Sequence, residues 1–324
     1  MDILVPASVA QYDLSRPPGN ANPGGGVGVK YARVEEVLQR RSPSVRRVSA
    51  LESIRSDFVI VDPLWFNWNN RDNREEKLEA FLQMAFPHVL LYGSEQNLLR
   101  WPARLREKLV SQVSWITHNC RYQRDMFRAC GIYQSQYLCD PVPEHIFYPV
   151  QKERRIYASG QISWEKNTEA LIEVFLYLQG SGIETCYIGS ASTWGDGDCP
   201  AADMRRQELA SELEEVTDVF LGNVSQAVAA RWANSSLYHL HVATHDCSCQ
   251  NQQEAALGGA VLWGLQHPIN GERPVFWYKS TAEVAEAILS YQHTRQAQDI
   301  ASLAQSNWSY EAFLRQFDRI LQED

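Results

Sequence analysis

Short apolar segments alternate with amphipathic stretches along almost the whole chain. Segments such as Phe58–Val61 and His88–Tyr92 are rich in β-branched and aliphatic residues over four or five positions, as buried strands are. Stretches such as Arg74–Phe86 and Thr168–Gln179 repeat their apolar residues at helical spacing. Strands that alternate with helices favour a parallel sheet, because parallel strands need long crossover connections. The sequence therefore predicts an α/β fold built on Rossmann-like sheets.

The length of 324 residues favours two domains. Two α/β blocks meet within Asp140–Lys152, which contains three prolines and suits a linker. We predict a first Rossmann-like domain over residues 1–145, a second over residues 146–306, and a C-terminal helix over residues 307–324. The predicted strands are Asp2–Val5, Phe58–Val61, His88–Tyr92, Val113–Thr117, Gln136–Cys139, Arg155–Ala158, Glu184–Ile188, Val219–Leu221, Leu237–Val242 and Ala260–Leu262.

The net charge of −9 is unevenly distributed. Residues 1–150 carry 18 Lys/Arg and 16 Asp/Glu, whereas residues 151–324 carry 12 and 23. A mildly basic first half permits a polyanionic partner there. The acidic total disfavours tight nonspecific binding to DNA.

The sequence also bears on membrane insertion, on the compartment of the protein and on the redox state of its cysteines. No apolar run approaches the roughly 20 residues of a membrane helix, so we expect no stable membrane insertion. The start of the chain has no basic region before an apolar one, which favours a cytoplasmic protein of a bacterium or of a virus-infected cell. The seven cysteines are odd in number and scattered, which indicates reduced thiols.

A glycine-rich segment, Asn22–Val29, follows the first predicted strand and leads into a predicted helix at Val29–Arg40. Glycines let the backbone approach a ligand, and a helix N-terminus offers free N–H groups to an anion. Phosphate is the expected ligand, and the backbone N–H groups of Gly25 and Gly26 are candidate hydrogen-bond donors to it. The alternative is a flexible loop. The segment is not a dinucleotide fingerprint, because no acidic residue at a second strand end is placed to bind a ribose.

Lys166 belongs to a second segment, Gly160–Asn167, that lies between a predicted strand and a predicted helix. This position is at the carboxyl end of the sheet, where open α/β sheets bind ligands. An ammonium group there would neutralise a diphosphate leaving group. The alternative is a solvated lysine at a helix start.

Asp246 and Glu254 are separated by seven residues where a strand leads through a loop into a helix. A carboxylate at Glu254 can accept hydrogen bonds from both ribose hydroxyls. Alternatively, Glu254 only complements the dipole of the helix. His245, Cys247 and Cys249 crowd around Asp246, but no second ligand pair at zinc-like spacing accompanies them, so we predict no metal site.

Basic and aromatic residues of the first half also admit two readings. The pairs Arg40–Arg41 and Arg46–Arg47 could contact a phosphate-rich acceptor, DNA or a membrane surface, although a solvated basic face is the commoner outcome. Trp65, Trp68 and Trp101 could stack on a sugar or a base, but core packing is the default.

Together these segments resemble the family-4 type of retaining glycosyltransferases, which have the GT-B fold. That family has a glycine-rich loop after its first strand, a Gly-Arg-x-x-x-x-Lys segment that opens its second domain, and a Glu-x7-Glu motif before Ala-x-x-x-Gly-x-Pro-Val. Gly24–Gly28, Gly160–Lys166 and Asp246–Glu254 fall in the same order here. Softer matches are Phe220–Val224 and Asn307–Glu311. The resemblance spans most of the chain and is strongest over residues 155–265.

Some motif positions depart from the family pattern. Gln161 stands where the family has its phosphate-binding arginine, Asp246 replaces the first glutamate, and Ala260 replaces the proline. A polar Gln250–Gln253 replaces an apolar run. The missing arginine bears on affinity for a diphosphate more than on the fold.

The resemblance implies two Rossmann-like domains that face a central cleft, with a C-terminal helix that returns to the first domain. It implies retaining transfer of a sugar from a nucleotide-diphosphate sugar, most commonly a UDP-sugar, to a hydroxyl acceptor, without a metal or other cofactor. Asp246 would contact the donor sugar, with His118 and Glu95 on the acceptor side. The expected donor-binding residues are Gly25, Gly26, Gln161, Lys166 and Glu254.

The acceptor stays open: it is either a glycan or lipid-linked sugar, or a hydroxymethylated DNA base. A second class of function is a non-catalytic nucleotide-binding module, which Gln161 and the polar Gln250–Gln253 favour. The hypothesis of a nucleotide-sugar isomerase is less favoured, because no pair of carboxylates in the sequence suggests a base close to the sugar. The sequence leaves the nucleotide base, the sugar and the oligomeric state open.

Overall fold

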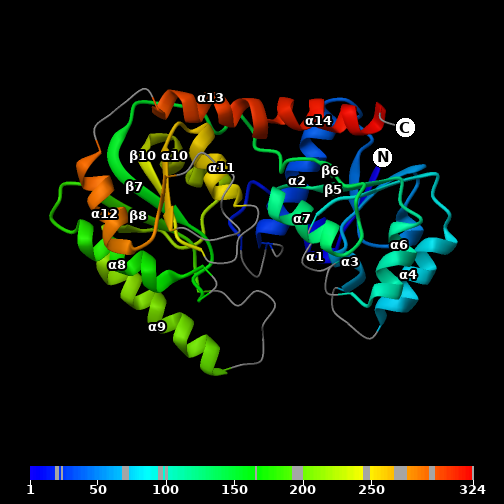
Figure 1. Cartoon of the computed structure of the whole chain (residues 1–324), viewed down its shortest axis with the longest axis horizontal. Coiled ribbons are helices and arrows are strands. Elements are labelled where there is room, and N and C mark those ends of the chain that lie inside the picture. Colours follow the sequence, from blue (N-terminus) through cyan, green and yellow to red (C-terminus); the bar gives the residue numbers. More distant parts are fainter. Residues whose placement is uncertain are drawn as a thin grey trace. The chain divides into compact units, whose positions relative to one another are not determined.

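The protein divides into two compact units. Unit 1 comprises Met1–Asp13, Asn22–Pro141 and Tyr310–Asp324, and unit 2 comprises Leu14–Ala21 and Val142–Ser309. Figure 1 follows the chain through both. The computed structural model describes residues 1–18, 22, 25–67, 73–93, 98, 101–164, 166–191, 200–243, 249–265, 276–291 and 296–322.

Within the described residues, unit 1 contains one parallel sheet in the order β2-β1-β3-β4-β5-β6. The chain therefore reverses its direction of winding between β1 and β3. The strands are β1 (Asp2–Leu4), β2 (Arg46–Val48), β3 (Phe58–Val61), β4 (His88–Leu91), β5 (Trp115–His118) and β6 (Gln136–Tyr137). The helices are α1 (Ala7–Ala10), α2 (Gly25–Gln39), α3 (Leu64–Asn67), α4 (Arg74–Gln83), α6 (Ala103–Val110), α7 (Arg121–Ala129) and α14 (Tyr310–Gln322).

The last helix of the chain, α14, packs into unit 1. The ring of Phe313 lies 6.2 Å from that of Tyr92, and the ring of Phe317 lies 6.0 Å from that of Phe58. The backbone N–H of Cys139 donates to the side chain of Gln316 at 2.9 Å. The return of a C-terminal helix to the first unit is thus confirmed.

Unit 2 also has one parallel sheet in its described part, in the order β12-β11-β10-β7-β8-β9. Counted from β7, this is the doubly wound order 3-2-1-4-5-6, with its switch point between β7 and β10. The strands are β7 (Glu153–Ser159), β8 (Glu184–Ile188), β9 (Val219–Phe220), β10 (Ser236–His241), β11 (Val261–Leu265) and β12 (Phe276–Tyr278).

Helices cover both faces of the unit 2 sheet (Figure 1). One layer contains α8 (Thr168–Leu178), α9 (Pro200–Val216) and α12 (Thr281–Ser290), which pack on one another. The other contains α10 (Gln226–Ser235), α11 (Gln250–Leu257) and α13 (Gln296–Trp308). Because both faces are covered, the central strand β10 is buried along its whole length. No helix in the described ranges is both long and apolar enough to cross a membrane.

Two strands and one long helix escaped the sequence prediction: β2, β12 and α13. β2 reads Arg-Arg-Val at the sheet edge, so its polar residues hide the strand pattern. Arg46 Nε lies 2.8 Å from the carboxylate of Asp2, and Arg47 Nε lies 2.8 Å from that of Glu35. Both arginines hold β2 against its own unit. The side chain of Arg46 stays 48% exposed, as a solvated basic face requires, whereas that of Arg47 is 11% exposed and departs from this expectation.

Two tryptophans considered as stacking platforms belong to the core of unit 1. Trp65 and Trp101 are buried, and both meet the ring of Phe66 edge-on, at 5.1 and 5.3 Å. Core packing, the default expectation, is confirmed for these two. Trp68 lies outside the described residues.

Candidate functional site

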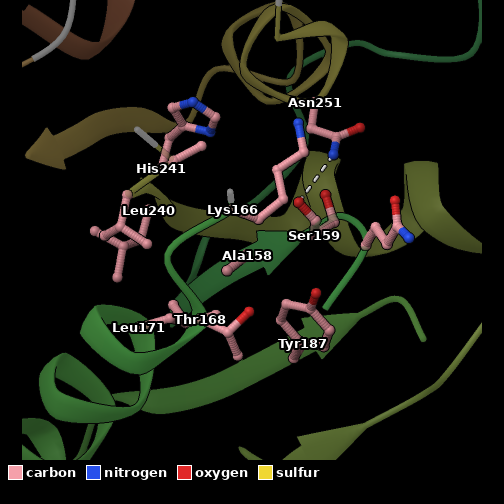
Figure 2. Close-up of a pocket in the computed structure, with 12 residues that line it drawn as sticks. Ala158, Ser159, Lys166, Thr168, Leu171, Tyr187, Leu240, His241 and Asn251 are labelled. Atoms are coloured by element: carbon pink, nitrogen blue, oxygen red, sulfur yellow. Dashed lines mark hydrogen bonds between the residues drawn. The ribbon is translucent and has the colours of Figure 1, made fainter. Parts of the chain in front are cut away.

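A pocket lies at the switch point of the unit 2 sheet (Figure 2). It opens at the carboxyl ends of β7 and β10, where the crossovers of the two neighbouring strands leave in opposite directions. Its volume is about 40 Å³, the space of a few water molecules, so a large ligand would place only one group inside it. The lining residues are Ala158, Ser159, Gln161, Lys166, Thr168, Leu171, Tyr187, Leu240, His241, Val242, Ala243 and Asn251.

The turn from β7 into α8 is held by its own hydrogen bonds. Ser163 N donates to Thr168 Oγ1 at 3.1 Å, and Thr168 Oγ1 donates to Ser163 O at 3.1 Å. Asn167 takes the left-handed conformation with φ 53° and donates from Nδ2 to Val242 O at 3.2 Å. The turn is thereby tied both to the start of α8 and to the end of β10. Lys166 sits in this turn, directly before Asn167, so its backbone position is set by these bonds.

Two glycines allow the backbone to close on itself beside the pocket. Gly160 has φ +149° and Gly189 has φ +155°, a region that side chains disfavour. A Cβ built on Gly189 would lie 1.8 Å from Gly160 O. Tyr187 Oη donates to the same carbonyl at 2.8 Å. The start of the Gly160–Asn167 segment is therefore clamped against the end of β8.

Two of the predicted donor-binding residues, Gln161 and Lys166, line this one pocket. The sequence analysis missed Asn251, which belongs to α11. Its Nδ2 donates to Ser159 O at 2.9 Å and ties the start of α11 to the end of β7. In Figure 2 the side chain of Lys166 extends toward Asn251. The pocket thus combines an ammonium group with amide and hydroxyl groups, which is a composition that suits a phosphate oxygen.

Glu254 also lies on α11, but in its second turn and 6% exposed. A carboxylate interacts best with the helix dipole in the first turn, and α11 has no acidic residue there. The alternative that Glu254 only complements the dipole of the helix therefore gains no support. Burial and the nearby Glu254 raise the pKa of Tyr157, whose phenol therefore stays protonated. Glu254 is therefore close enough to Tyr157 of β7 to affect its ionisation.

Two histidines on β10 were not singled out from the sequence. His241 lines the pocket, and its Nδ1 lies 3.3 Å from the Sγ of Cys249. His239, on the same face of the strand, is buried with its ring 5.3 Å from that of Tyr157. Burial, with a smaller contribution from His241, lowers the pKa of His239 to about 3. A signal was present, since two polar residues alternate within a buried strand.

The burial of His239 predicts acid sensitivity of unit 2. The unfolded chain takes up a proton at this imidazole below pH about 6.5, whereas the folded chain resists it until about pH 3. Stability should therefore fall as pH falls through this window, by up to about 1.4 kcal/mol per pH unit. We expect His239→Phe to flatten this slope in urea unfolding measured from pH 7 to pH 4. The exposed His88, changed to Gln, serves as control. An unchanged slope for His239→Phe would contradict the prediction.

Gly25, Gly26 and His118 belong to unit 1 rather than to the unit that holds the pocket. α2 begins at Gly25, four residues earlier than predicted, so the glycines form its first turn and not a loop. Gly26 has open space where a Cβ would lie. At Gly28 a Cβ would lie 2.5 Å from the ring of Tyr12, so close packing against this ring requires a glycine at position 28.

His118 ends β5 and is buried. Its Nδ1 lies 3.1 Å from Ser135 Oγ, and burial together with Arg124 and Arg128 lowers its pKa to about 4. The imidazole is therefore neutral at pH 7.

Glu95, His245, Asp246 and Cys247 lie outside the described residues, so their roles stay predictions. In the described part of the chain, no three His, Cys, Asp or Glu side chains gather as a metal site requires.

The carboxyl edge of the unit 1 sheet is occupied by a buried polar network. Lys30 Nζ lies 2.8 Å from the carboxylate of Asp140 and 4.3 Å from the centre of the Tyr92 ring. Tyr92 Oη donates to the same carboxylate at 2.9 Å, and Asn119 Nδ2 donates to its other oxygen at 3.2 Å. These groups bind one another and so fix the ends of β4, β5 and β6.

Two Rossmann-like units, with a pocket at the switch point of the second and a C-terminal helix returning to the first, define the GT-B fold. Solved glycosyltransferase structures match it. A sucrose-phosphate synthase from Thermosynechococcus elongatus has a TM-score of 0.74 at 12% identity, covering 100% of this chain and 98% of that chain. HepE of Anabaena in complex with UDP-glucose has a TM-score of 0.69 at 12% identity, over 100% and 99%.

A third match is an alpha-glucosyltransferase in complex with UDP, with a TM-score of 0.62 at 11% identity over 99% of both chains. At such identities the likeness shows the fold alone. No protein-family model and no curated protein sequence matches the chain. Membership of the family-4 type therefore stays a prediction.

Proposed function

We propose that this protein transfers a sugar from a nucleotide-diphosphate sugar to a hydroxyl acceptor. The observation that carries the proposal is Lys166, whose side chain lines a pocket at the switch point of a doubly wound sheet. Open α/β sheets bind nucleotides at such points. The matching structures of HepE with UDP-glucose and of an alpha-glucosyltransferase with UDP support a UDP-sugar as donor.

The chemistry of the proposal is stabilisation of a leaving diphosphate. As the bond between the anomeric carbon and the phosphate oxygen breaks, negative charge grows on the diphosphate. Lys166, next to the N-terminus of α8, supplies positive charge there without a metal. Gln161 offers an amide N–H to the same group. Glu254 is proposed to hold the ribose, and Asp246 to contact the donor sugar.

Transfer with retention at the anomeric carbon is part of the proposal, with acceptor-side roles for His118 and Glu95, and with the backbone N–H groups of Gly25 and Gly26 as additional donor-binding groups. With its pKa lowered to about 4, His118 suits hydrogen bonding to an acceptor better than removal of its proton. A glycan, a lipid-linked sugar and a hydroxymethylated DNA base are the acceptors considered.

A second candidate function is nucleotide binding without turnover. Gln161 favours it, because a neutral amide lines the pocket where the resembling family places an arginine. An amide binds a phosphate more weakly than a guanidinium does. A protein of this kind would retain the fold and the ability to bind a nucleotide but would not catalyse sugar transfer.

One experiment separates the two functions. Thermal shift is measured with UDP-glucose, UDP-N-acetylglucosamine, GDP-mannose and UDP alone, and release of the free nucleoside diphosphate (UDP or GDP) from any nucleotide-sugar that binds is then followed over hours. A stabilising nucleotide-sugar from which the protein releases its nucleoside diphosphate supports the transferase. Stabilisation without release supports the binding module. No shift with any of these donors contradicts both.

A further inference from the structure

A buried asparagine of unit 2 holds the segment that leads into β7, residues 146–152. Asn234 lies in the last turn of α10 and is 5% exposed. Its Oδ1 accepts a hydrogen bond from Tyr148 N at 3.1 Å, and its Nδ2 donates to Ile146 O at 2.8 Å. The amide can bind a stretch of backbone in this way because it carries a donor and an acceptor side by side. The segment is therefore fixed to the end of α10.

Lys152, at the end of this segment, joins the ends of two helices. Its Nζ donates to Asn234 O at 2.6 Å and also to the carbonyl of Gly258, which directly follows α11. The last carbonyl groups of a helix carry partial negative charge and lack partners within the helix, so they suit an ammonium group. Burial lowers the pKa of Lys152 to about 8, so the side chain is still charged at pH 7. One cation is thus bound to α10 and α11 at once.

The ends of α10 and α11 meet without space for a side chain. A Cβ at Gly258 would lie 2.9 Å from Ala233 O and 3.1 Å from the Cα of Asn234. Both neighbours are backbone atoms of α10, which cannot give way as a flexible side chain can. The C-terminal end of α11 therefore lies directly on the backbone of α10, and Lys152 binds both.

The opposite end of α11 reaches the candidate donor pocket. Asn251, in its first turn, lines the pocket and donates to Ser159 O at 2.9 Å. The helix has eight residues, which corresponds to about 12 Å of rise, and six of them are buried. A short helix in a close-packed interior moves as one body, because its neighbours leave no space for bending. A shift at Gly258 is therefore transmitted to Asn251 and Glu254.

We propose that Lys152 and Asn234 are positioning residues of the donor site. They set the position of α11 and, through it, the positions of Asn251 and Glu254. Neither is among the described residues that line the pocket, so both act through the helix and not on the ligand. The identity of the ligand rests on the proposed function, whereas the attachment of α11 does not.

The test compares Lys152→Met and Asn234→Ala with the wild type. Methionine removes an ammonium group that is costly to bury, so the variant should stay folded, which circular dichroism verifies. We expect amide hydrogen exchange in a peptide that spans α11 to become about tenfold faster in each variant, and exchange in a peptide that spans α8 to stay unchanged. In calorimetry, UDP-glucose should bind about fivefold more weakly, because the groups that hold it are displaced.

Lys77→Met is the matched control. Lys77 belongs to unit 1, its Nζ donates to Trp65 O at 3.3 Å, and burial lowers its pKa as well. This variant also removes an ammonium group bound to a backbone carbonyl. It should leave both the exchange of α11 and the affinity for UDP-glucose unchanged.

The pH dependence of binding separates positioning from a purely structural role. The groups that bind the ammonium of Lys152 are uncharged carbonyls of α10 and α11, and burial is the cause of its lowered pKa. A neutral amine makes weaker hydrogen bonds than an ammonium group does. The affinity of the wild type for UDP-glucose should therefore fall between pH 7 and pH 9.5, with a midpoint at about 8, and Lys152→Met should lack this step.

Unchanged hydrogen exchange in α11 of Lys152→Met would overturn the inference, whether or not a nucleotide-sugar binds. Affinity for UDP-glucose equal to that of the wild type at pH 7, or the same pH step in both proteins, would overturn it as well. If Lys152→Met does not fold, the pH profile of the wild type decides, and a flat profile counts against the inference. A wild type that binds no nucleotide-sugar contradicts the proposed function instead, and hydrogen exchange then tests the attachment of α11 by itself.

Discussion

Lys166→Ala should lower kcat/KM for the donor by about 10²- to 10³-fold, the usual effect of removing one group that stabilises a developing oxyanion. The ammonium lines the pocket where the diphosphate is proposed to lie, and among the described lining residues it is the one Lys or Arg. Water admitted by the truncation would solvate the phosphate less well than a fixed charge does. Donor binding should weaken as well, by tenfold or more, since a hydrogen bond to a charged group contributes about 1.5–3 kcal/mol.

The measurement is isothermal titration calorimetry with UDP-glucose, together with a UDP-release assay. Lys279→Ala, at an exposed position of the same unit, is the matched control and should leave both unchanged. Gln161→Arg should tighten donor binding about tenfold, because it restores a charge-assisted contact. If both Lys166→Ala and Glu254→Ala bind the donor as the wild type does, the assignment of the donor site is wrong.

Gly189→Ala should destabilise unit 2 by more than about 4 kcal/mol, at the upper end of single substitutions. The added methyl carbon would lie 1.8 Å from Gly160 O and 2.9 Å from Gly160 C, backbone atoms of the residue that follows β7, the strand paired with β8. Relief requires the end of β8 to move away from the Gly160–Asn167 segment. We therefore expect the pocket to change along with the stability.

Gly180→Ala separates the steric effect from backbone strain. Gly180 also has a positive φ, +72°, but a Cβ there meets nothing within 4 Å. It should cost only about 1–2 kcal/mol, the penalty of the left-handed conformation. Urea unfolding followed by tryptophan fluorescence measures both variants. Equal losses at positions 180 and 189 would mean that contact with Gly160 contributes nothing.

Much of the fold was predictable, because repeated apolar segments report burial. The central strands β3 and β4 each show as an apolar run, whereas β7 and β10 also contain charged or polar residues and were predicted from the apolar residues among them. The two strands that the sequence did not predict, β2 and β12, lie at the edges of their sheets, where a strand pairs with a neighbour on one side only. In β2 the arginines pair with Asp2 and Glu35, acids distant in sequence, and no local pattern predicts such partners.

The candidate site was predictable only in part. Lys166 follows a strand and precedes a helix, so its place at the carboxyl edge is a consequence of local order along the chain. Asn251 and His241 reach the same pocket from α11 and β10. Their presence depends on β10 pairing with β7, a contact between segments about 80 residues apart.

The sequence by itself determined the α/β class, the C-terminal helix and the position of Lys166 between strand and helix, because these depend on periodicity and local order. Only the tertiary structure decided which strands are neighbours, and therefore that Lys166, Gln161 and Asn251 share one pocket. It also decided that the arginines of β2 are paired inside unit 1. Ion pairs and pockets join residues that are distant along the chain, so they become visible only when packing has brought those residues together.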